Sequence, residues 1–406
     1  MLLIDFFEVI PINALLPIRT LSPDKVAYLI DTEQLDTTDA RHMEQAVSGV
    51  EGVTSFTYVP IRSDDVEQMK ERMRAVIESA APDESVFIDL TGGTDLMVAS
   101  GYSVAMETRA VPIHIDLVRR EVFRVDTLER IGGVTDISLK DYLTAIGAKQ
   151  LRGSRGNPTD EEGAVICEMA EVLFRRTSEW HALCDKIAIA FSKKSDSRSR
   201  TFSITNRIEY VNKRGFNPKS LMKEFCRRGF VRYLGEEDNL TEGEPGERVY
   251  HYELTDIKYK EYMTIFGIWL EMYVYFKTKP YFDEAYLGMV IDWDNDDEVD
   301  TVDNEIDVAL MKGSVPYFIS CKMRKLEAAD IYEIGFITER FGGDYGKCFV
   351  ATTHSLESSK RGPRSLHIKM DKMNVGLILV TEDYPFRKLI QSQRMEPRVI
   401  EDELEP

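Results

Sequence analysis

The sequence predicts an α/β protein of three domains, with a doubly wound unit at residues 1–150, a basic helical module at 151–255 and a second α/β unit at 256–406. Three observations support this prediction. β-type runs alternate with helical patterns at both ends of the chain. A polar, glycine-rich stretch at 147–163 is typical of a linker. From residue 193 to 232 the chain carries 12 Lys or Arg against three acids, although its net charge is −19.

The composition is that of a globular protein of the cell interior. A chain of 406 residues exceeds what one hydrophobic core usually organises, and 43% apolar with 30% charged residues suits packed domains. No apolar run approaches the roughly 18–20 residues that a membrane span needs. The apolar start carries Asp5 and Glu8, which favours a first strand over a signal peptide. The five cysteines are scattered and odd in number, which indicates reduced thiols and a cytoplasmic location.

Residues 1–126 alternate between the periods of strands and helices. The clearest helical face contains Val66, Met69, Met73, Val76 and Ile77. Alternation of strands with helices predicts a mostly parallel, Rossmann-like sheet. The expected strands are Val26–Asp31, Thr54–Val59, Val86–Asp89, Val111–Ile115 and Glu121–Val125.

Beyond the linker, the sequence predicts helices at Glu162–Arg175 and Pro218–Arg228 and strands at Phe230–Leu234 and Val249–Leu254, around an acidic loop at 235–247. A helix followed by a long-looped hairpin is the pattern of a winged helix. Together with the basic run, it predicts a module that contacts nucleic acid. A plain connector domain with a solvated basic face is the alternative.

The C-terminal third predicts a second α/β unit with its own core. It begins with a long helix at Tyr259–Phe276. The further elements expected there are strands at Tyr286–Trp293, Glu305–Met311, Val315–Cys321, Lys347–Thr352 and Val375–Val380, and a helix at Ala328–Phe341.

Two of these strands carry a candidate catalytic constellation. Because strand side chains alternate between faces, Glu305 and Asp307 share one face, and Ser320 and Lys322 share a face of the next strand. Carboxylates without histidines suit Mg²⁺ or Mn²⁺, which activate water and neutralise charge on a phosphate. Lys322 is then placed to position the water or to stabilise the phosphate. A surface ion pair between Asp307 and Lys322 is the alternative interpretation.

A third carboxylate, Glu271, lies on a predicted helix with apolar neighbours, where a Glu is costly unless it has a partner. The order of Glu271, Asp307 and Ser320-Cys321-Lys322 resembles the PD-(D/E)xK nucleases, with Ser320 where that superfamily usually has Glu or Asp. The resemblance implies a restriction-endonuclease-like fold and metal-dependent cleavage of DNA, RNA or both. It implies Glu271, Glu305, Asp307, Ser320 and Lys322 as catalytic residues. Glu271, Glu305, Asp307 and the Cys321 carbonyl are then the metal ligands.

A second motif, Val86–Met97, reads as a strand, a glycine-rich loop and the start of a helix. Paired Gly92 and Gly93 allow a ligand close to the backbone, and the N–H groups of a helix N-terminus favour phosphate. Thr91 and Thr94 add hydroxyl groups. The loop lacks the Gly-Lys-Ser/Thr of a Walker A motif. A tight strand–helix turn without a ligand is the alternative.

The sequence DLTGGT followed by Met97, and the early loop Pro11-Ile12-Asn13, resemble the CARF domains of type III CRISPR systems over roughly residues 1–145. The resemblance implies a Rossmann-like homodimer that binds a cyclic oligoadenylate across its two-fold axis. Asp95 stands where that family often has Lys. The implied activator-binding residues are Pro11, Ile12, Asn13, Thr91, Gly92, Gly93, Thr94, Asp95 and Met97.

Taken together, the two motifs are similar to the CARF-fused ancillary nucleases of type III CRISPR antiviral defence. That resemblance implies an endonuclease that cyclic tetra-adenylate activates and that uses Mg²⁺ or Mn²⁺. One alternative is a CARF-type transcription regulator that binds DNA through the basic module. Another is a sensor that degrades its nucleotide at Thr91–Asp95, which ranks last because only Asp89 and Asp95 offer a general base there.

Overall fold

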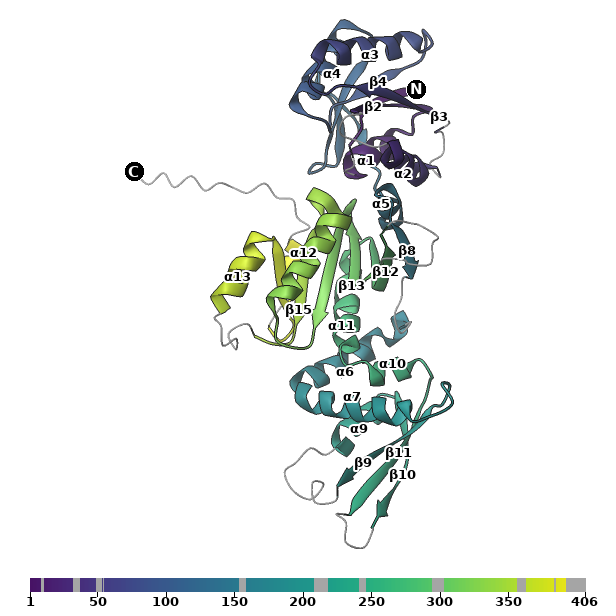
Figure 1. Ribbon diagram of the computed structural model, residues 1–406, viewed down its shortest axis with the longest axis vertical. Helices are drawn as coiled ribbons and strands as arrows, with labels where there is room; N and C mark the ends of the chain where they lie inside the picture. The colour runs from purple at the N-terminus through teal and green to yellow at the C-terminus, as the bar shows by residue number, and fades with distance from the viewer. Residues whose placement is uncertain are drawn as a thin grey trace, which may run out of the picture.

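The computed structural model describes residues 1–8, 11–31, 37–48, 53, 55–152, 158–207, 218–240, 246–293, 303–355, 363–382 and 385–391. In these ranges the strands form three sheets. The three bodies that contain them follow one another along the long axis, and the C-terminal body lies in the centre, between the N-terminal body and the middle of the chain (Figure 1). Among the described helices, none is long and apolar enough to cross a membrane.

The N-terminal sheet has the order β3-β2-β1-β4-β5-β6-β7, in which β1 to β5 are parallel and β6 and β7 are antiparallel. This parallel sheet confirms the doubly wound prediction. Its elements are β1 Leu2–Phe6, α1 Pro11–Leu21, β2 Lys25–Asp31, α2 Thr37–Val47, β3 Ser55–Ile61, α3 Val66–Ser79, β4 Val86–Asp89, α4 Asp95–Glu107, β5 Val111–Asp116, β6 Glu121–Arg124, β7 Arg130–Gly133 and α5 Leu139–Ala145.

Residues of β1 show why this sheet needs helices on both faces. Leu3 belongs to a core with α1, α2 and α5, whereas Leu2 and Ile4 belong to a core with α3 and α4. Because successive side chains of a strand point to opposite faces, an apolar strand without alternation is buried on both sides. The predicted helical face of α3 is in this second core, with Met69, Met73 and Ile77 buried.

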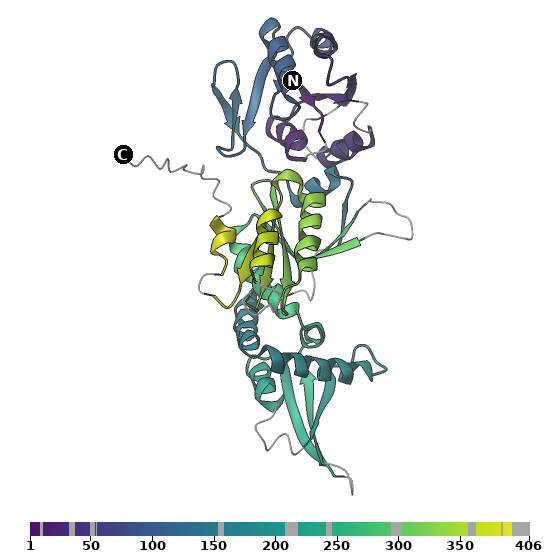
Figure 2. The same ribbon diagram turned by 60° about the vertical axis from the view of Figure 1, so that its left-hand side comes forward.

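The middle sheet is antiparallel in the order β10-β11-β9. Its elements are η1 Asp160–Glu162, α6 Gly163–Arg175, α7 Thr177–Ser192, β9 Thr201–Arg207, α9 Pro218–Arg227, β10 Val231–Asn239 and β11 Glu247–Leu254. Figure 2 shows its strands running away from the rest of the molecule. The expected acidic loop at 235–247 begins as strand, because β10 pairs with β11 as far as Asn239 opposite Glu247. Arg248 pairs with Asp238 at 2.6 Å and Lys219 with Glu236 at 2.5 Å on this hairpin.

The C-terminal sheet has the order β16-β15-β14-β13-β12-β8, with parallel pairing from β14 to β16 and antiparallel pairing elsewhere. α11 packs on β12 to β15, and α12 on β14 to β16. The elements are β8 Lys149–Arg152, α10 Tyr259–Thr264, α11 Ile268–Thr278, η2 Lys279–Tyr281, β12 Glu284–Asp292, β13 Asp303–Lys312, β14 Val315–Lys322, α12 Ala328–Gly342, η3 Gly343–Tyr345, β15 Lys347–Thr352, α13 Pro363–Lys372, β16 Val375–Leu379 and α14 Arg387–Gln391.

Two expectations for connections are wrong. The long helix expected at Tyr259–Phe276 is broken into α10 and α11, because Ile265 is extended and the Phe266 carbonyl accepts the Trp180 Nε1–H at 3.1 Å. This carbonyl is therefore used outside the helix. The linker expected at 147–163 contains β8, which pairs with β12 in the C-terminal sheet.

The N-terminal body touches the C-terminal sheet at the turn between β13 and β14. Arg120, in the turn between β5 and β6, binds Asp136 through both terminal nitrogens, at 2.9 and 2.6 Å. The Ser314 Oγ donates to Asp136 at 3.0 Å and accepts the Ile137 N–H at 3.0 Å. A Cβ on Gly313 would lie 2.5 Å from Arg120. This closely packed network joins the two bodies at the end of β13 and β14.

Candidate functional site

The strands that were predicted to carry the candidate active site are neighbours. β13 and β14 pair antiparallel with Val308 opposite Ile319, so Asp307 and Ser320 stand at the next pair of positions. The Asp307 Oδ2 accepts the Cys321 backbone N–H at 2.6 Å. Asp307 and the Ser320–Lys322 segment therefore lie together, as the strand pattern predicts.

Glu271 is a buried carboxylate, 5% exposed, in the first turn of α11. Its Oε1 lies 3.5 Å from the position that a Cβ would take on Gly267, the residue that caps this helix. The free N–H groups at a helix N-terminus stabilise a nearby negative charge, which offsets part of the cost of burying the carboxylate. The expected single helix would have placed Glu271 mid-helix, without this compensation.

The charges of Glu271, Asp307 and Lys322 all act on the buried thiol of Cys321. Burial raises the pKa of Cys321 well above its usual value, the nearby carboxylates of Asp307 and Glu271 raise this pKa further, and Lys322 lowers it. Two carboxylates and an ammonium group from α11, β13 and β14 thus act on one buried point.

A cleft of about 540 Å³ opens beside this point. Lys322 and Cys321 line one side of it, together with the chain that follows β14. The start of α7 in the middle of the chain and Phe266 line it as well. The lining residues are Thr177, Ser178, His181, Phe266, Cys321, Lys322, Met323, Arg324, Lys325 and His354.

The two remaining predicted catalytic residues differ in environment. Ser320 is 9% exposed. Glu305 is exposed, two residues before Asp307 on the same strand. Within the described ranges, no group of three or more His, Cys, Asp or Glu side chains is placed to hold a metal ion together. The predicted set of three carboxylate ligands is thus not assembled within these ranges, and Glu271 and Asp307 are the two carboxylates whose charges act on Cys321.

The second site is the glycine loop, Thr91–Thr94, between β4 and α4. Gly93 has a φ of +93°, and a Cβ there would lie 3.2 Å from Met97 and from Phe6, so the loop requires glycine. The Thr94 Oγ1 caps α4 by accepting the Met97 N–H at 3.4 Å. The Thr91 hydroxyl donates to Asp89 at 2.6 Å and accepts the Ile115 N–H at 2.9 Å. Both hydroxyls, expected to contact a ligand, also hold the loop.

Glu8 is part of this site, although the sequence indicated no role for it beyond its charge. Its Oε1 accepts the Gly93 N–H at 2.9 Å, and its Oε2 accepts the Asn13 amide at 2.5 Å. A Cβ on Gly92 would lie 2.8 Å from the same Oε2. The Glu8 carboxylate therefore accepts the backbone N–H of Gly93, which was expected to bind an anionic ligand. The only sequence signal was the position of Glu8 just after the first strand.

Two buried acids lie beneath Glu8. Burial raises the pKa of Asp89 to about 7, with Glu8 adding to the increase and hydrogen bonds from Thr91 opposing it. Burial also raises the pKa of Asp5 well above its usual value, and the charges of Asp89 and Glu8 raise it further. One oxygen of each buried acid and the Oδ1 of Asn13 have no hydrogen-bond partner within the described residues.

The other residues of the predicted activator site gather around the glycine loop. Pro11, Ile12 and Asn13 are buried in the first turn of α1, not in a loop as expected, because proline suits the first position of a helix. Met97 is 6% exposed, and Asp95 is exposed.

The outer face of α4 is apolar and open. Leu96, Tyr102 and Met106 are 49%, 39% and 48% exposed. A cavity of about 690 Å³ beside them is lined by Val98, Ala99, Tyr102 and residues of β5, β6 and the turns that follow these two strands. Contiguous exposed apolar surface of this kind is uncommon on a monomer and marks interaction sites.

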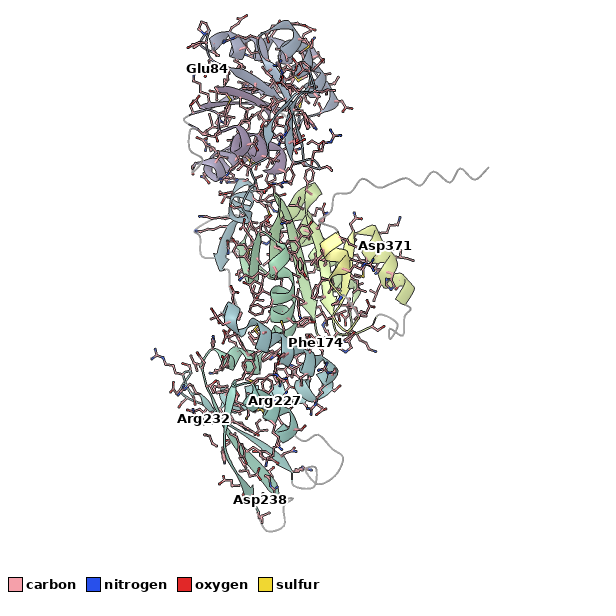
Figure 3. The ribbon with its side chains drawn as sticks, turned by 180° about the vertical axis from the view of Figure 1, so that it is seen from behind. Glu84, Phe174, Arg227, Arg232, Asp238 and Asp371 are labelled. Carbon is pink, nitrogen blue, oxygen red and sulfur yellow. The ribbon has the colours of Figure 1, made fainter. Side chains whose placement is uncertain are left out.

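The basic run at 193–232 is less charged in the folded chain than its sequence indicates. Arg227 and Arg228 both pair with Glu224, and Arg232 pairs with Glu253. Figure 3 shows Arg227 and Arg232 in the middle body, with Asp238 farther along the hairpin. Residues 208–217 of the run lie outside the described residues.

No protein-family model and no curated protein matches the chain. Solved structures match almost all of it, VC1899 and Can2 among them. VC1899 from Vibrio cholerae aligns with a TM-score of 0.72 and 14% identity, over 97% of this chain and 96% of that one. Can2 from Sulfobacillus thermosulfidooxidans, in complex with cyclic tetra-adenylate, aligns with a TM-score of 0.65 and 16% identity, over 96% and 97%. The chain shares their fold.

Proposed function

We propose that the chain is a metal-dependent endonuclease that cyclic tetra-adenylate activates in type III CRISPR defence. The observation that carries the proposal is that Asp307 binds the Cys321 N–H beside the cleft that Lys322 lines, while the charge of Glu271 also acts on Cys321. A likeness of fold to Can2, whose structure contains cyclic tetra-adenylate, supports the choice of activator.

Glu271 and Asp307 fit a hard divalent cation such as Mg²⁺ or Mn²⁺. A buried carboxylate beside a second one is costly without a cation, and Mg²⁺ is commonly held by one or two carboxylates with water and substrate phosphate. The Cys321 carbonyl and the exposed Glu305 are the further candidates for ligands. When bound, the ion supplies charge neutralisation and an activated water.

The chain's own residues supply the rest of the site. Asp307 is fixed by the Cys321 N–H, so its other carboxylate oxygen keeps a defined direction. Lys322 lines the cleft, where its ammonium group stabilises the negative charge that develops on the scissile phosphate. Ser320 stands where a carboxylate is usual and contributes a hydroxyl group instead.

The glycine loop is the proposed activator site, and the two-fold symmetry of the cyclic activator implies a homodimer. A cyclic ring with two-fold symmetry is matched by two copies of one loop, with one ring bound per dimer. The apolar face of α4, which begins at the glycine loop, supplies the surface that a second copy would cover. Activation then requires that the ring binds the active state of the dimer more tightly than the inactive state.

The test compares the wild type with Asp307→Ala, with plasmid DNA and single-stranded RNA as substrates. We expect cleavage only with Mn²⁺ or Mg²⁺ and stimulation by cyclic tetra-adenylate. The variant should lose cleavage while it keeps its fold and its affinity for the activator. Undiminished cleavage by the variant would refute the site. Binding of a defined DNA without any cleavage would instead support a transcription regulator.

A further inference from the structure

The far wall of the cleft does not come from the sheet that carries Asp307 and Lys322. It consists of Thr177, Ser178 and His181 at the start of α7, and of Phe266 in the turn between α10 and α11. The middle of the chain therefore encloses the cleft. These four residues belong neither to the PD-(D/E)xK motif nor to the basic run at 193–232, so neither of these predictions gives them a function.

Two rings form an open surface in this wall. The rings of His181 and Phe266 lie 4.8 Å apart at 79°, an edge-to-face pair. The His181 side chain is 60% exposed, and Phe266 is only partly buried. An edge-to-face pair leaves ring surface available to a further partner, since each ring covers only part of the other.

The position of the ring pair is fixed relative to the candidate catalytic carboxylate. Trp180 is fully buried, and its Nε1–H donates to the Phe266 carbonyl at 3.1 Å, which ties the turn to α7 next to His181. The next residue, Gly267, caps α11, and Glu271 lies in the first turn of that helix. Phe266 and Glu271 thus lie on one short segment, which the Trp180 hydrogen bond ties to α7 beside His181.

The opposite side of the cleft is cationic. Lys322, Arg324 and Lys325 line it, although Arg324 is paired with the buried Asp330 at 2.6 Å. Burial and the charge of Lys325 lower the pKa of His354, which also lines the cleft. One side of the cleft thus suits a phosphate, and the other suits a flat apolar group. A nucleotide has both.

We propose that His181 and Phe266 form a platform on which one nucleobase of the substrate stacks, next to the phosphate that is cleaved. A volume of about 540 Å³ is in the range of pockets for small molecules, so the cleft has room for a single base that has left its stack. The inference rests on the proposed nuclease function and adds a role for α7 in binding the substrate.

The experiment pairs protein variants with substrates that lack one base. Phe266→Leu keeps the apolar packing but removes the ring, Phe266→Tyr keeps the ring, and His181→Ala changes an exposed residue. Tyr281→Ala is the matched control, since Tyr281 is 48% exposed and lies beyond the far end of α11. Each variant is assayed on an oligonucleotide and on copies with an abasic residue at each position beside the cleavage site.

Stacking of a base on an aromatic side chain predicts a loss of kcat/KM from about fivefold to about 150-fold in Phe266→Leu. His181→Ala should show a smaller loss, and Phe266→Tyr and Tyr281→Ala should match the wild type. The wild type should lose a similar factor on one abasic substrate. Phe266→Leu should lose nothing more on that substrate, because ring and base act as one pair.

The proposal would be overturned if the loss caused by Phe266→Leu and the loss caused by the missing base multiplied for every abasic substrate. Wild-type rates in both Phe266→Leu and His181→Ala would overturn it as well. Thermal melting checks that the variants are folded. If Phe266→Leu does not fold, His181→Ala still tests the proposal, because His181 is exposed. Asp307→Ala separates the two proposals, because cleavage that survives in it refutes the nuclease site itself.

Discussion

Glu8 occupies the backbone N–H that an anionic activator needs, so its charge should oppose binding. Glu8→Gln removes that charge and keeps an oxygen that can accept the Gly93 N–H, as Glu8 does at 2.9 Å. The new amide group has a partner within reach, since the Oδ1 of Asn13 is buried without a hydrogen bond. The substitution therefore changes charge far more than shape.

The expected size of the effect follows from Coulomb's law. Two like unit charges about 5 Å apart repel by about 3 kcal/mol at an effective dielectric constant of about 20. Salt screens part of this repulsion, and each 1.4 kcal/mol is about a tenfold change in affinity. Glu8→Gln should thus bind cyclic tetra-adenylate from about tenfold to about 100-fold more tightly at low salt.

Isothermal titration calorimetry of the full-length protein measures the affinity at two salt concentrations. Glu78→Gln is the control, because it removes the same charge from an exposed position near the end of α3. The gain for Glu8→Gln should shrink as salt is added. Unchanged or weaker binding relative to this control would mean that no phosphate of the activator lies near the Gly93 N–H.

Three further predictions test the second site and its connection to the first. Gly93→Val should abolish stimulation by the activator but keep basal cleavage, because a left-handed φ and the contacts with Met97 and Phe6 distort the loop; normal stimulation in nuclease assays would contradict this. Arg120→Ala should bind the activator normally by calorimetry yet lose stimulation, since Arg120 joins the two bodies through Asp136; full stimulation would exclude this route. The pKa of Asp89 is raised to about 7, so the protonated form of Asp89 favours the folded state. Its contribution to the free energy of unfolding is complete below about pH 4 and is lost as the pH rises through about 7. Asp89→Asn should therefore reduce the fall in melting temperature between about pH 5 and about pH 8, and an equally steep fall would refute this assignment.

Local patterns predicted the strands well, whereas the catalytic roles of the candidate residues stay a prediction. Alternation along a strand placed Asp307 with the Ser320–Lys322 segment, because only the pairing of neighbouring strands was needed. The break before α11 was not predictable, since it depends on a hydrogen bond from Trp180, 86 residues away in the sequence.

Glu8 shows the same limit at the other site. Its contact with Gly93 spans 85 residues, and neither residue carries a local signal for it. The cleft wall also escaped prediction, because α7 meets the chain after β14 only in the folded protein. Pairing between adjacent strands can be read from a sequence, whereas contacts between bodies depend on how the bodies are arranged.

The pairing of β8 with β12 has a consequence for how the middle body is attached. These strands are adjacent in the C-terminal sheet, yet the whole middle body lies between them in the sequence. The middle body, residues 160–254, is an insertion that follows β8 and leads back through α10 and α11, and α11 packs on β12 to β15, so the body is joined to the C-terminal sheet at both of its ends. A fragment that starts after residue 152 would lack an edge strand, whereas replacing the insertion by a short connection would preserve the sheet.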